Sequence, residues 1–372
     1  MHSRYVCIVI ASGLAFSSVE ISAATIDSFS QTNLTSDLSG VANNTDTLLV
    51  NPWGIVAGPT TPFWISDNGS GMSTVYNGAG QPFPSGTPIQ VSIPGPGGMG
   101  SGAPDGIVFN GTAANFGGSH FIFATEDGTV AAWTSGTSAT LGVDQSSSGA
   151  VYKGLAIAGN DLYVANFNAG TVDVFNSSFA PITVPGGFSD PSLPSGYAPF
   201  NIAFINGELY VTYAVQDGAK HDDVAGAGNG IIDVFNTDGV LQQRLVSNGA
   251  LNSPWGLAIA PTGFGPFGGD LLVGNFGDGT INAFDPTTGT LLGTLDDANG
   301  NPIVNQGLWG LAFGNGSQGT STNTLYFTAG IPGPDTVESH GLFGSLEPTP
   351  EPATFLLLAG GLAVVVGLRR RR

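Results

Sequence analysis

A short sequence pattern recurs six times along this chain, and this repetition limits the possible folds more than any other feature. Two copies are closely similar: residues 162–176 have the sequence LYVANFNAGTVDVFN, and residues 271–285 have LLVGNFGDGTINAFD. Each copy holds a strand-like segment, a glycine turn and a second alternating segment, which is the pattern of a β-hairpin. Looser copies occupy residues 63–76, 121–133, 325–343 and, with an insertion, 209–235.

A further short strand precedes each hairpin and has its own signature, as in Pro52-Trp53-Gly54-Ile55-Val56. The third positions of these signatures are 52, 48, 47, 55 and 54 residues apart, and they are Gly54, Gly106, Gly154, Asn201, Gly256 and Gly310. Units of about 50 residues with three visible strands are typical of the blades of a β-propeller.

The outermost strands predict how the ring of blades closes. Candidate strands follow the first five hairpins, at residues 88–93, 139–143, 181–184, 240–246 and 290–295, whereas none follows the sixth. An unassigned candidate strand occurs at residues 25–34, and its pairing with the sixth blade would close the ring and remove exposed sheet edges. We therefore expect residues 25–346 to form one all-β domain, a six-bladed β-propeller closed by an N-terminal strand.

Composition excludes several classes of function. Residues 25–352 contain three basic residues, Lys153, Lys220 and Arg244, against 26 acidic residues, which gives a net charge of −23. Such a surface repels nucleic acid and anionic membranes and tolerates cations. The only cysteine, Cys7, falls within the first 24 residues. A protein that lost this segment would have no disulfide, no thiolate nucleophile and no cysteine-ligated metal.

Both ends of the chain have the features of export signals. Residues 1–24 combine a weakly basic start, an apolar stretch and small residues before position 25, which is typical of a secretory signal peptide. Residues 347–372 contain a proline–glutamate–proline triplet, an uncharged apolar run at 353–368 and a basic end. The triplet is Pro350, Glu351 and Pro352, and the basic end is Arg369, Arg370, Arg371 and Arg372. The run is only slightly shorter than a bilayer-spanning helix, and the arginines would stay on the cytoplasmic side.

This C-terminal sequence resembles the sorting tail of the PEP-CTERM proteins of Gram-negative bacteria. The resemblance implies export through the Sec machinery and processing by an exosortase, a membrane enzyme that recognises such tails. It also implies membrane attachment through the C-terminal helix before processing, followed by a place at the cell surface or outside the cell. A plain, permanent C-terminal anchor is the alternative interpretation.

The body of the chain resembles six-bladed propellers of the NHL-repeat and gluconolactonase-like type. More narrowly, it is similar to a family of uncharacterised secreted PEP-CTERM propellers. Four segments carry this resemblance, at residues 197–202, 220–230, 254–261 and 340–346. It implies a fold and a location but no known activity. Gluconolactonase-like enzymes use a divalent metal in the channel, but their ligand triad cannot be mapped onto this chain.

Residues that open the innermost strands are expected to line the mouth of the channel, where propellers usually bind ligands. In this chain we assign that ring to Trp53, Asp105, Lys153, Asn201, Trp255 and Trp309. Three tryptophans on one ring could stack on a sugar or another flat group. The alternative is that each tryptophan packs between neighbouring blades.

Two sets of residues are candidate metal ligands. The insertion at residues 216–230 contains Asp217, His221, Asp222 and Asp223. Its carboxylates suit Ca²⁺ or Mg²⁺, and its imidazole suits Zn²⁺ or Mn²⁺. A solvated loop is the alternative interpretation.

The second set occupies equivalent strand ends in three hairpins and consists of Asp67, Asn166 and Asn275. If those ends face the channel, the three side chains could hold one cation on the axis. Ordinary turn chemistry is the alternative, because Asp and Asn beside glycine are what tight turns require.

Two functions from different classes remain open on the sequence. The first is a non-catalytic binding or structural protein at the cell surface or in an extracellular polysaccharide matrix, with polysaccharide or surface proteins as partners. The second is a Ca²⁺-dependent lactonase or another metal-dependent hydrolase with its site in the channel. We favour the first, because the chain lacks the Gly-x-Ser-x-Gly, His-Glu-x-x-His and phosphate-loop motifs.

Overall fold

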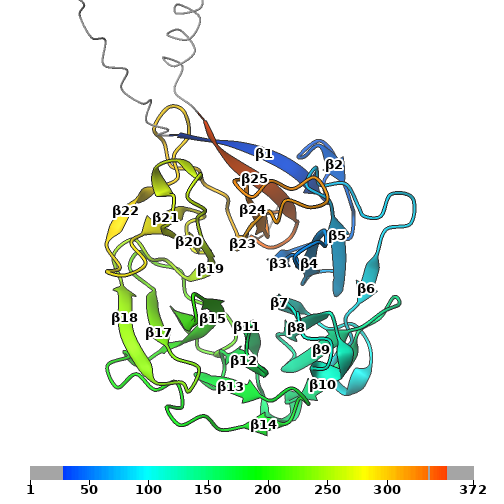
Figure 1. The fold of residues 1–372 in the computed structure, drawn as a ribbon, viewed down its shortest axis with the longest axis vertical. Helices are drawn as coiled ribbons and strands as arrows, with labels where there is room; N and C mark the ends of the chain where they lie inside the picture. Colours follow the sequence, from blue (N-terminus) through cyan, green and yellow to red (C-terminus); the bar gives the residue numbers. More distant parts are fainter. Residues whose placement is uncertain (1–27, 334–335, 350–372) are drawn as a thin grey trace, which may run out of the picture. The chain divides into compact units, whose positions relative to one another are not determined.

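The computed structural model describes residues 28–333 and 336–349, and these residues form an all-β ring of six antiparallel sheets around one axis (Figure 1). The prediction of a six-bladed propeller is therefore confirmed. The proposed signal peptide at 1–24, the Pro-Glu-Pro triplet and the terminal arginines lie outside the described residues. Helices within the described part are three-residue 3-10 turns, and none has the length and hydrophobicity needed to cross a bilayer.

Each of the first five blades contains four strands, which follow one another along the chain from the innermost to the outermost. Blade one is β3 (Pro52–Val56), β4 (Phe63–Asp67), β5 (Met72–Tyr76) and β6 (Gln90–Ser92), and blade two is β7 (Pro104–Phe109), β8 (Phe121–Thr125), β9 (Thr129–Trp133) and β10 (Thr140–Asp144). Blade three is β11 (Tyr152–Ala158), β12 (Asp161–Asn166), β13 (Thr171–Phe175) and β14 (Pro181–Ile182). Blade four is β15 (Tyr197–Ile205), β16 (Glu208–Val215), β17 (Ile231–Phe235) and β18 (Leu241–Ser247), and blade five is β19 (Pro254–Ile259), β20 (Leu271–Asn275), β21 (Ile281–Phe284) and β22 (Leu291–Thr294). The 3-10 turns are η1 (Pro96–Gly98), η2 (Phe116–Gly118), η3 (Ser146–Ser148) and η4 (Gly265–Phe267).

The sixth blade joins the two ends of the described chain. It contains β23 (Leu308–Phe313), β24 (Leu325–Ala329), β25 (Leu342–Thr349), β1 (Ser28–Ser36) and a short parallel strand, β2 (Asn44–Thr45). Strand β1 pairs antiparallel with β25 along its whole length. The N-terminal strand thus closes the ring as predicted. Strand β25 extends to Thr349, so the predicted domain boundary between residues 346 and 347 falls inside a strand.

Close approach of neighbouring innermost strands explains the glycine in each signature. A Cβ atom on Gly54 would lie 2.6 Å from the carbonyl oxygen of Asp105 in the next blade, and one on Gly310 would lie 2.6 Å from that of Trp53. Both distances are shorter than a van der Waals contact, so a side chain at either position would push the strands apart. Blade four carries Asn201 instead, whose Nδ2 atom donates a hydrogen bond to the carbonyl oxygen of Trp255 at 2.7 Å.

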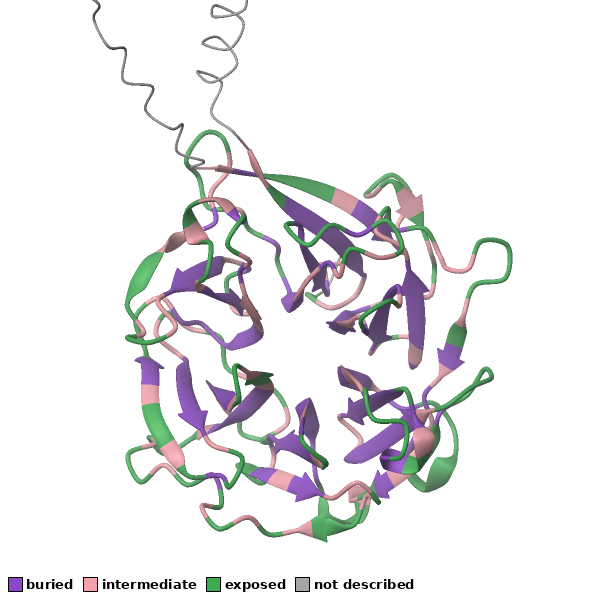
Figure 2. Ribbon diagram, in the orientation of Figure 1, coloured by how far each residue is buried: buried purple, intermediate pink, exposed green. Residues whose placement is uncertain are grey.

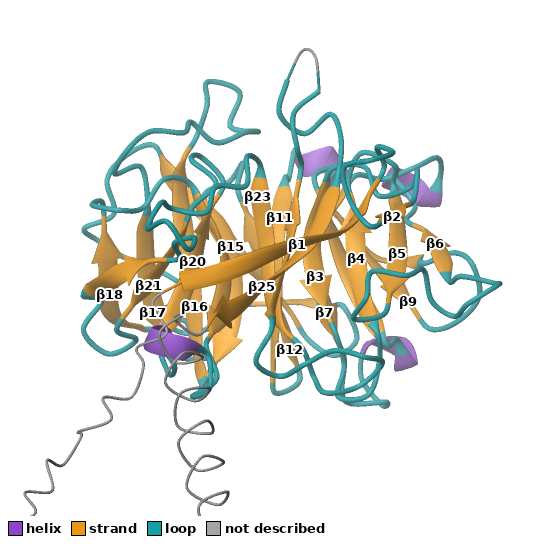
Figure 3. Ribbon diagram, turned by 90° about the horizontal axis from the view of Figure 1, so that it is seen from above, coloured by secondary structure: helices purple, strands orange, loops and turns teal. Residues whose placement is uncertain are grey.

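Burial decreases from the second strand of each blade to the outermost strand (Figure 2). Strands β4, β8, β20 and β24 are fully buried, whereas β14 and β22 are exposed or half-buried. Loops gather at the two faces of the ring (Figure 3). Innermost strands begin opposite the ends of second strands, as in the pairs Pro52–Asp67 and Pro254–Asn275. We call the face where the innermost strands begin the loop face.

Candidate functional site

Three tryptophans fill the propeller axis near the loop face. The rings of Trp53 and Trp309 stack with centroids 3.4 Å apart, and Trp255 meets each of them edge-on at 5.9 Å. Their residues are 1–4% exposed. The three rings therefore contact one another on the axis, which is neither of the arrangements considered from the sequence. They are not separated between blades, and they offer no open ring face on which a sugar could stack.

Blade four contributes a different residue to this ring than the one assigned from the sequence. Phe200, and not Asn201, follows the first residue of its signature, and its ring lies 6.5 Å from Trp53 and 5.9 Å from Trp309. Asn201 takes the place of the signature glycine, where it bridges to the next blade. The ring residue expected in blade four was the third residue of its signature, Asn201, whereas the other five blades contribute the second residue. We call Trp53, Phe200, Trp255 and Trp309 the aromatic plug.

The remaining two ring positions, in blades two and three, are buried and charged. Lys153 is 1% exposed, and its Nζ atom makes an ion pair with Glu126 and lies 3.6 Å from Oδ1 of Asp222. The same ammonium lies 4.8 Å from the ring centroid of Trp53, as in a cation–π contact. Burial alone would lower the pKa of Lys153, but Glu126 and Asp105 outweigh it and hold the pKa above its ordinary value. Lys153 is therefore a buried, charged ammonium.

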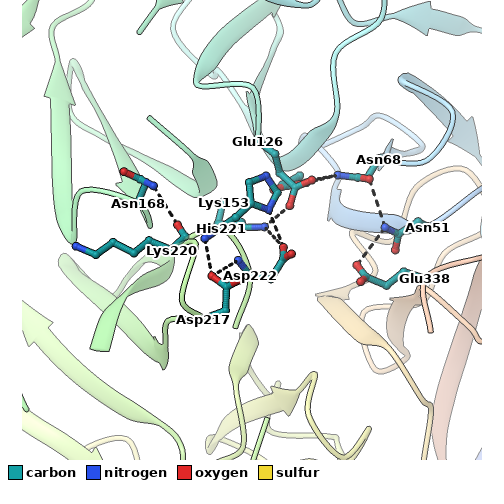
Figure 4. Close-up of polar contacts among 11 residues, drawn as sticks. Asn51, Asn68, Glu126, Lys153, Asn168, Asp217, Lys220, His221, Asp222 and Glu338 are labelled. Carbon is teal, nitrogen blue, oxygen red and sulfur yellow. Dashed lines mark hydrogen bonds and ion pairs between the residues drawn. The ribbon is translucent and has the colours of Figure 1, made fainter. Parts of the chain in front are cut away.

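Amide side chains extend this ion pair across neighbouring blades (Figure 4). Nδ2 of Asn68 donates hydrogen bonds to Oδ1 of Asp105 at 2.8 Å and to Oε2 of Glu126 at 2.9 Å. Nδ2 of Asn51 donates to Oδ1 of Asn68 at 3.3 Å and to Oε1 of Glu338 at 3.1 Å. The network runs from the β24–β25 loop of blade six, through blade one, to the charged pair of blades two and three.

The insertion between β16 and β17 reaches this network from blade four. Nδ1 of His221 lies 2.9 Å from Oδ1 of Asp222, which in turn faces Lys153. Asp217 has a structural role instead, because its Oδ1 accepts a hydrogen bond from the backbone N–H of His221 at 2.9 Å. Of the four candidate ligands in the insertion, Asp222 thus faces the ring residue Lys153, and His221 contacts Asp222.

The other proposed metal set is not brought together. Oδ2 of Asp67 accepts a hydrogen bond from Thr74, Nδ2 of Asn166 donates to Asp173, and Nδ2 of Asn275 donates to the carbonyl oxygen of Ala250. Thr74 and Asp173 lie on the third strands of their own blades, so Asp67 and Asn166 are turned away from the axis. The geometry gives no support to a shared axial cation at these three residues.

Five carboxyl groups lie close enough to the Lys153 ammonium to interact with its charge, and we call them the carboxylate cluster: Asp105, Glu126, Asp222, Asp223 and Glu338. Burial, followed by the nearby Glu126, raises the pKa of Asp105 well above its ordinary value. Burial also raises the pKa of Asp223, and it raises the pKa of Glu338 to about 7. Burial is the largest cause of each of these three shifts, and the nearby ammonium of Lys153 does not offset it.

Part of this cluster has the geometry of a metal site. One ligand atom each from Glu126, His221 and Asp222 lie within 4.8 Å of one another. Two carboxylates and an imidazole are a donor set for divalent ions such as Mn²⁺ or Zn²⁺. One oxygen nearby also lacks a partner: Oδ2 of the fully buried Asp105 makes no hydrogen bond to any described residue. The residues present therefore fit a divalent cation.

Behind the aromatic plug, the axis opens into a channel of different chemistry. This channel has a volume of about 400 Å³, and Trp255 lies at its plugged end. All six innermost strands contribute apolar residues to its wall, namely Ile55, Ile107, Leu155, Ile202, Leu257 and Leu311. Phe204, 43% exposed, lies in the same lining. Carboxylates are not among the lining residues, so the charged part of the axis lies on the loop-face side of the plug.

Glu126, Asn68 and Glu338 belong to the site but were not singled out as such in the sequence. Glu126 and Asn68 lie in hairpin turns, where turn chemistry explains them fully. Glu338 has a φ of 73°, a conformation that costs free energy for a residue other than glycine. It lies in the long turn of the sixth hairpin, at a position without a counterpart in the short hairpin turns, so no sequence signal marked it. A sharper signal was available for Glu126, because it and Lys153 occur in adjacent repeats of a chain poor in bases.

The comparisons with known proteins address location first. Residues 348–372 match the PEP-CTERM protein-sorting motif. This motif implies exosortase-dependent export, with membrane anchoring followed by a place at the surface. The match starts within β25, which ends at Thr349.

Solved structures confirm the fold. A glucose dehydrogenase superposes with a TM-score of 0.53 at 12% identity, covering 85% of this chain and 98% of that chain. Virginiamycin B lyase from Staphylococcus aureus superposes with a TM-score of 0.51 at 15% identity, covering 86% and 98%. At these identities, the likeness is one of fold alone.

Sequence relatives are much closer. Uncharacterized protein R648 of Acanthamoeba polyphaga mimivirus is 34% identical over an alignment of 318 residues, and the match covers 80% of this chain and 76% of that protein. Uncharacterized protein L690 of the same virus is 34% identical over an alignment of 332 residues, and the match covers 84% of each chain. This chain is therefore a six-bladed β-propeller that belongs to the same family as mimivirus proteins R648 and L690 and that carries a PEP-CTERM sorting motif.

Proposed function

We propose that this protein is an exported, non-catalytic binding propeller that recognises cations or cationic groups at the carboxylate cluster of its loop face. One observation carries the proposal: several blades bring five carboxyl groups near a single buried ammonium, which pairs directly with Glu126 and faces Asp222. Burial raises the pKa values of Asp105 and Glu338, so their carboxylate forms are disfavoured. A bound cation would stabilise those forms.

The proposed setting is the outer surface of a Gram-negative cell or its polysaccharide matrix, reached through Sec and an exosortase. The sorting motif supports the export step. Net charge supports binding to cations or to cation-bridged polymers, because the body of the chain is strongly acidic. Polysaccharide and surface proteins remain the partners that we propose for this setting.

Calorimetric titration of the purified protein with Ca²⁺ and with Mn²⁺ tests the proposal. We expect saturable binding that Glu126→Gln weakens by at least about tenfold, because the variant removes a charged ligand. Glu208→Gln is the matched control, since Glu208 opens β16 at the face opposite the loop face. The proposal fails if neither ion binds, or if both variants lose affinity equally.

A metal-dependent hydrolase or lactonase is the second candidate, favoured by the grouping of Glu126, His221 and Asp222. A divalent ion held there would act as a Lewis acid on a bound ester or lactone. His221 is 45% exposed and could meet such a substrate. Turnover of a panel of lactones and aryl esters that disappears on chelation, and in His221→Ala, would favour hydrolysis over binding.

A further inference from the structure

The ammonium of Lys153 faces two of the carboxylates that a divalent cation would need. It pairs with Glu126 and lies 3.6 Å from Oδ1 of Asp222. The same two carboxylates, together with His221, form the group of candidate ligands within 4.8 Å. The carboxylate oxygens of Glu126 and Asp222 could therefore bind either the Lys153 ammonium or a divalent metal ion.

We propose that Lys153 is a built-in competitor of metal binding: a divalent cation enters between Glu126, His221 and Asp222 only by displacing the Lys153 ammonium from the two carboxylates. The inference rests on the proposed cation-binding role of the cluster and gives that role a mechanism. Lys153 sets the affinity, so the site fills when the divalent ion is abundant and stays closed by its own lysine when the ion is scarce.

A second carboxylate is placed to receive the displaced ammonium. Asp105 is 0% exposed, and its Oδ2 atom has no hydrogen-bond partner among the described residues. Its other oxygen, Oδ1, shares the amide of Asn68 with Glu126, so Asp105 lies beside the ion pair. The ammonium can therefore leave Glu126 for a carboxyl group whose Oδ2 atom is without a partner, and its approach would favour the ionised form of Asp105, so that the buried charge keeps a counter-ion.

The chain supplies a matched pair of lysines for the test. Lys153 and Lys220 are the only lysines, so each substitution by methionine removes one positive charge. Lys220 lies in the same insertion as the candidate ligands, but its side chain is exposed and directed away from Glu126 and Asp222 (Figure 4). Any effect of net charge alone is therefore common to both variants, whereas competition for the carboxylates belongs to Lys153.

Titration of the full-length wild type, Lys153→Met and Lys220→Met with Mn²⁺ by calorimetry tests the inference. We expect Lys153→Met to bind Mn²⁺ at least about tenfold more tightly than the wild type, because a full positive charge leaves the immediate surroundings of the ion. Lys220→Met should stay within about threefold of the wild type, since exposed charges are screened. Equal or weaker binding by Lys153→Met than by Lys220→Met would overturn the competition.

Failure of this inference differs from failure of the proposed function. Wild-type binding that Glu126→Gln weakens, without a gain in Lys153→Met, removes the competition but leaves the binding site in place. If neither the wild type nor Lys153→Met binds Mn²⁺, both the competition and the proposed cation site are contradicted.

Melting curves cover the case in which Lys153→Met is unstable, since the variant leaves Glu126 and Asp105 without their ammonium. Mn²⁺ should then fold it, or raise its melting temperature more than that of the wild type. A variant that stays unfolded in saturating Mn²⁺ would contradict the inference.

Discussion

The loop-face end of the propeller axis and the channel behind it are built from the same six strands but differ in chemistry. At the loop face, the second residue of each signature is either aromatic or charged, as in Trp53 and Lys153. Two positions further on, every signature has isoleucine or leucine, and these residues line the channel. Residues two positions apart in the same signature therefore belong to different regions, the charged site and the apolar channel. The aromatic plug lies between these two regions.

The difference also separates two kinds of stabilisation. Residues of the channel wall are stabilised by removal of apolar surface from water, which depends little on pH or salt. The stability contribution of the carboxylate cluster depends on charge instead, because burial raises the pKa values of Asp105 and Glu338 and so disfavours their ionised forms in the folded protein. Substitutions in each region test whether the two are as distinct as the structure indicates.

Removal of a plug residue should have the largest effect, because it breaks the boundary itself. Trp255 is 4% exposed and lies in both the plug and the channel lining. We expect Trp255→Ala to lower the free energy of unfolding by roughly 3–5 kcal/mol, as for other buried aromatic residues. Urea denaturation measures this loss. Phe204→Ala at the exposed part of the channel is the control and should lose less than about 1 kcal/mol.

A channel-wall substitution should have the next largest effect and should be insensitive to charge. Leu155 lines the channel and packs between blades two and three. We expect Leu155→Ala to lower the free energy of unfolding by roughly 2–4 kcal/mol through lost burial and a residual cavity. The loss, measured in urea, should be the same at pH 5 and pH 8 and in low and high salt. A strong dependence on either would mean that the channel is electrostatically coupled to the loop face.

Asp105→Asn should show the opposite behaviour, with an effect that changes with pH. Burial raises the pKa of Asp105, so the folded state binds this proton more tightly than the unfolded state. The contribution of Asp105 to stability is therefore fully present below its ordinary pKa near 3.8 and is lost as pH rises through the folded value. The asparagine variant cannot ionise and lacks this loss.

Melting temperatures of wild type and Asp105→Asn across pH 4–8 measure the difference. We expect the free energy of unfolding of Asp105→Asn, relative to that of the wild type, to increase with pH by on the order of 2 kcal/mol across this range. Parallel curves for the two proteins would show that Asp105 does not titrate with a raised pKa.

Much of this fold was predictable from the sequence, because each blade repeats a hairpin and a glycine signature. The closing strand β1 was predictable by elimination. The sixth blade lacked an outer strand, and one candidate strand near the N-terminus was not assigned to any blade. The ring residue of blade four was expected one position too late in the sequence, at Asn201, which replaces the signature glycine. A backbone contact, the bridge from Asn201 to Trp255, explains that replacement and is visible only in the structure.

The site was predictable only in part. Lys153, His221 and Asp222 were all candidates, but in separate sets, because nothing in the sequence says that the blade-four insertion folds back over blades two and three. The tryptophans were expected to face a ligand or to separate blades, and packing on the axis satisfies neither. Glu338 depends on a strained conformation in the long turn of the sixth hairpin, where the repeat has no equivalent position.

Anomalous diffraction from crystals of the protein soaked in Mn²⁺ tests the central claim most directly. The account predicts an anomalous peak at bonding distance from the carboxylates of Glu126 and Asp222 and from the imidazole of His221, with the Lys153 ammonium turned toward Asp105. A peak only at exposed loops elsewhere, or Lys153 still paired with Glu126 in a crystal that has bound Mn²⁺, would contradict it.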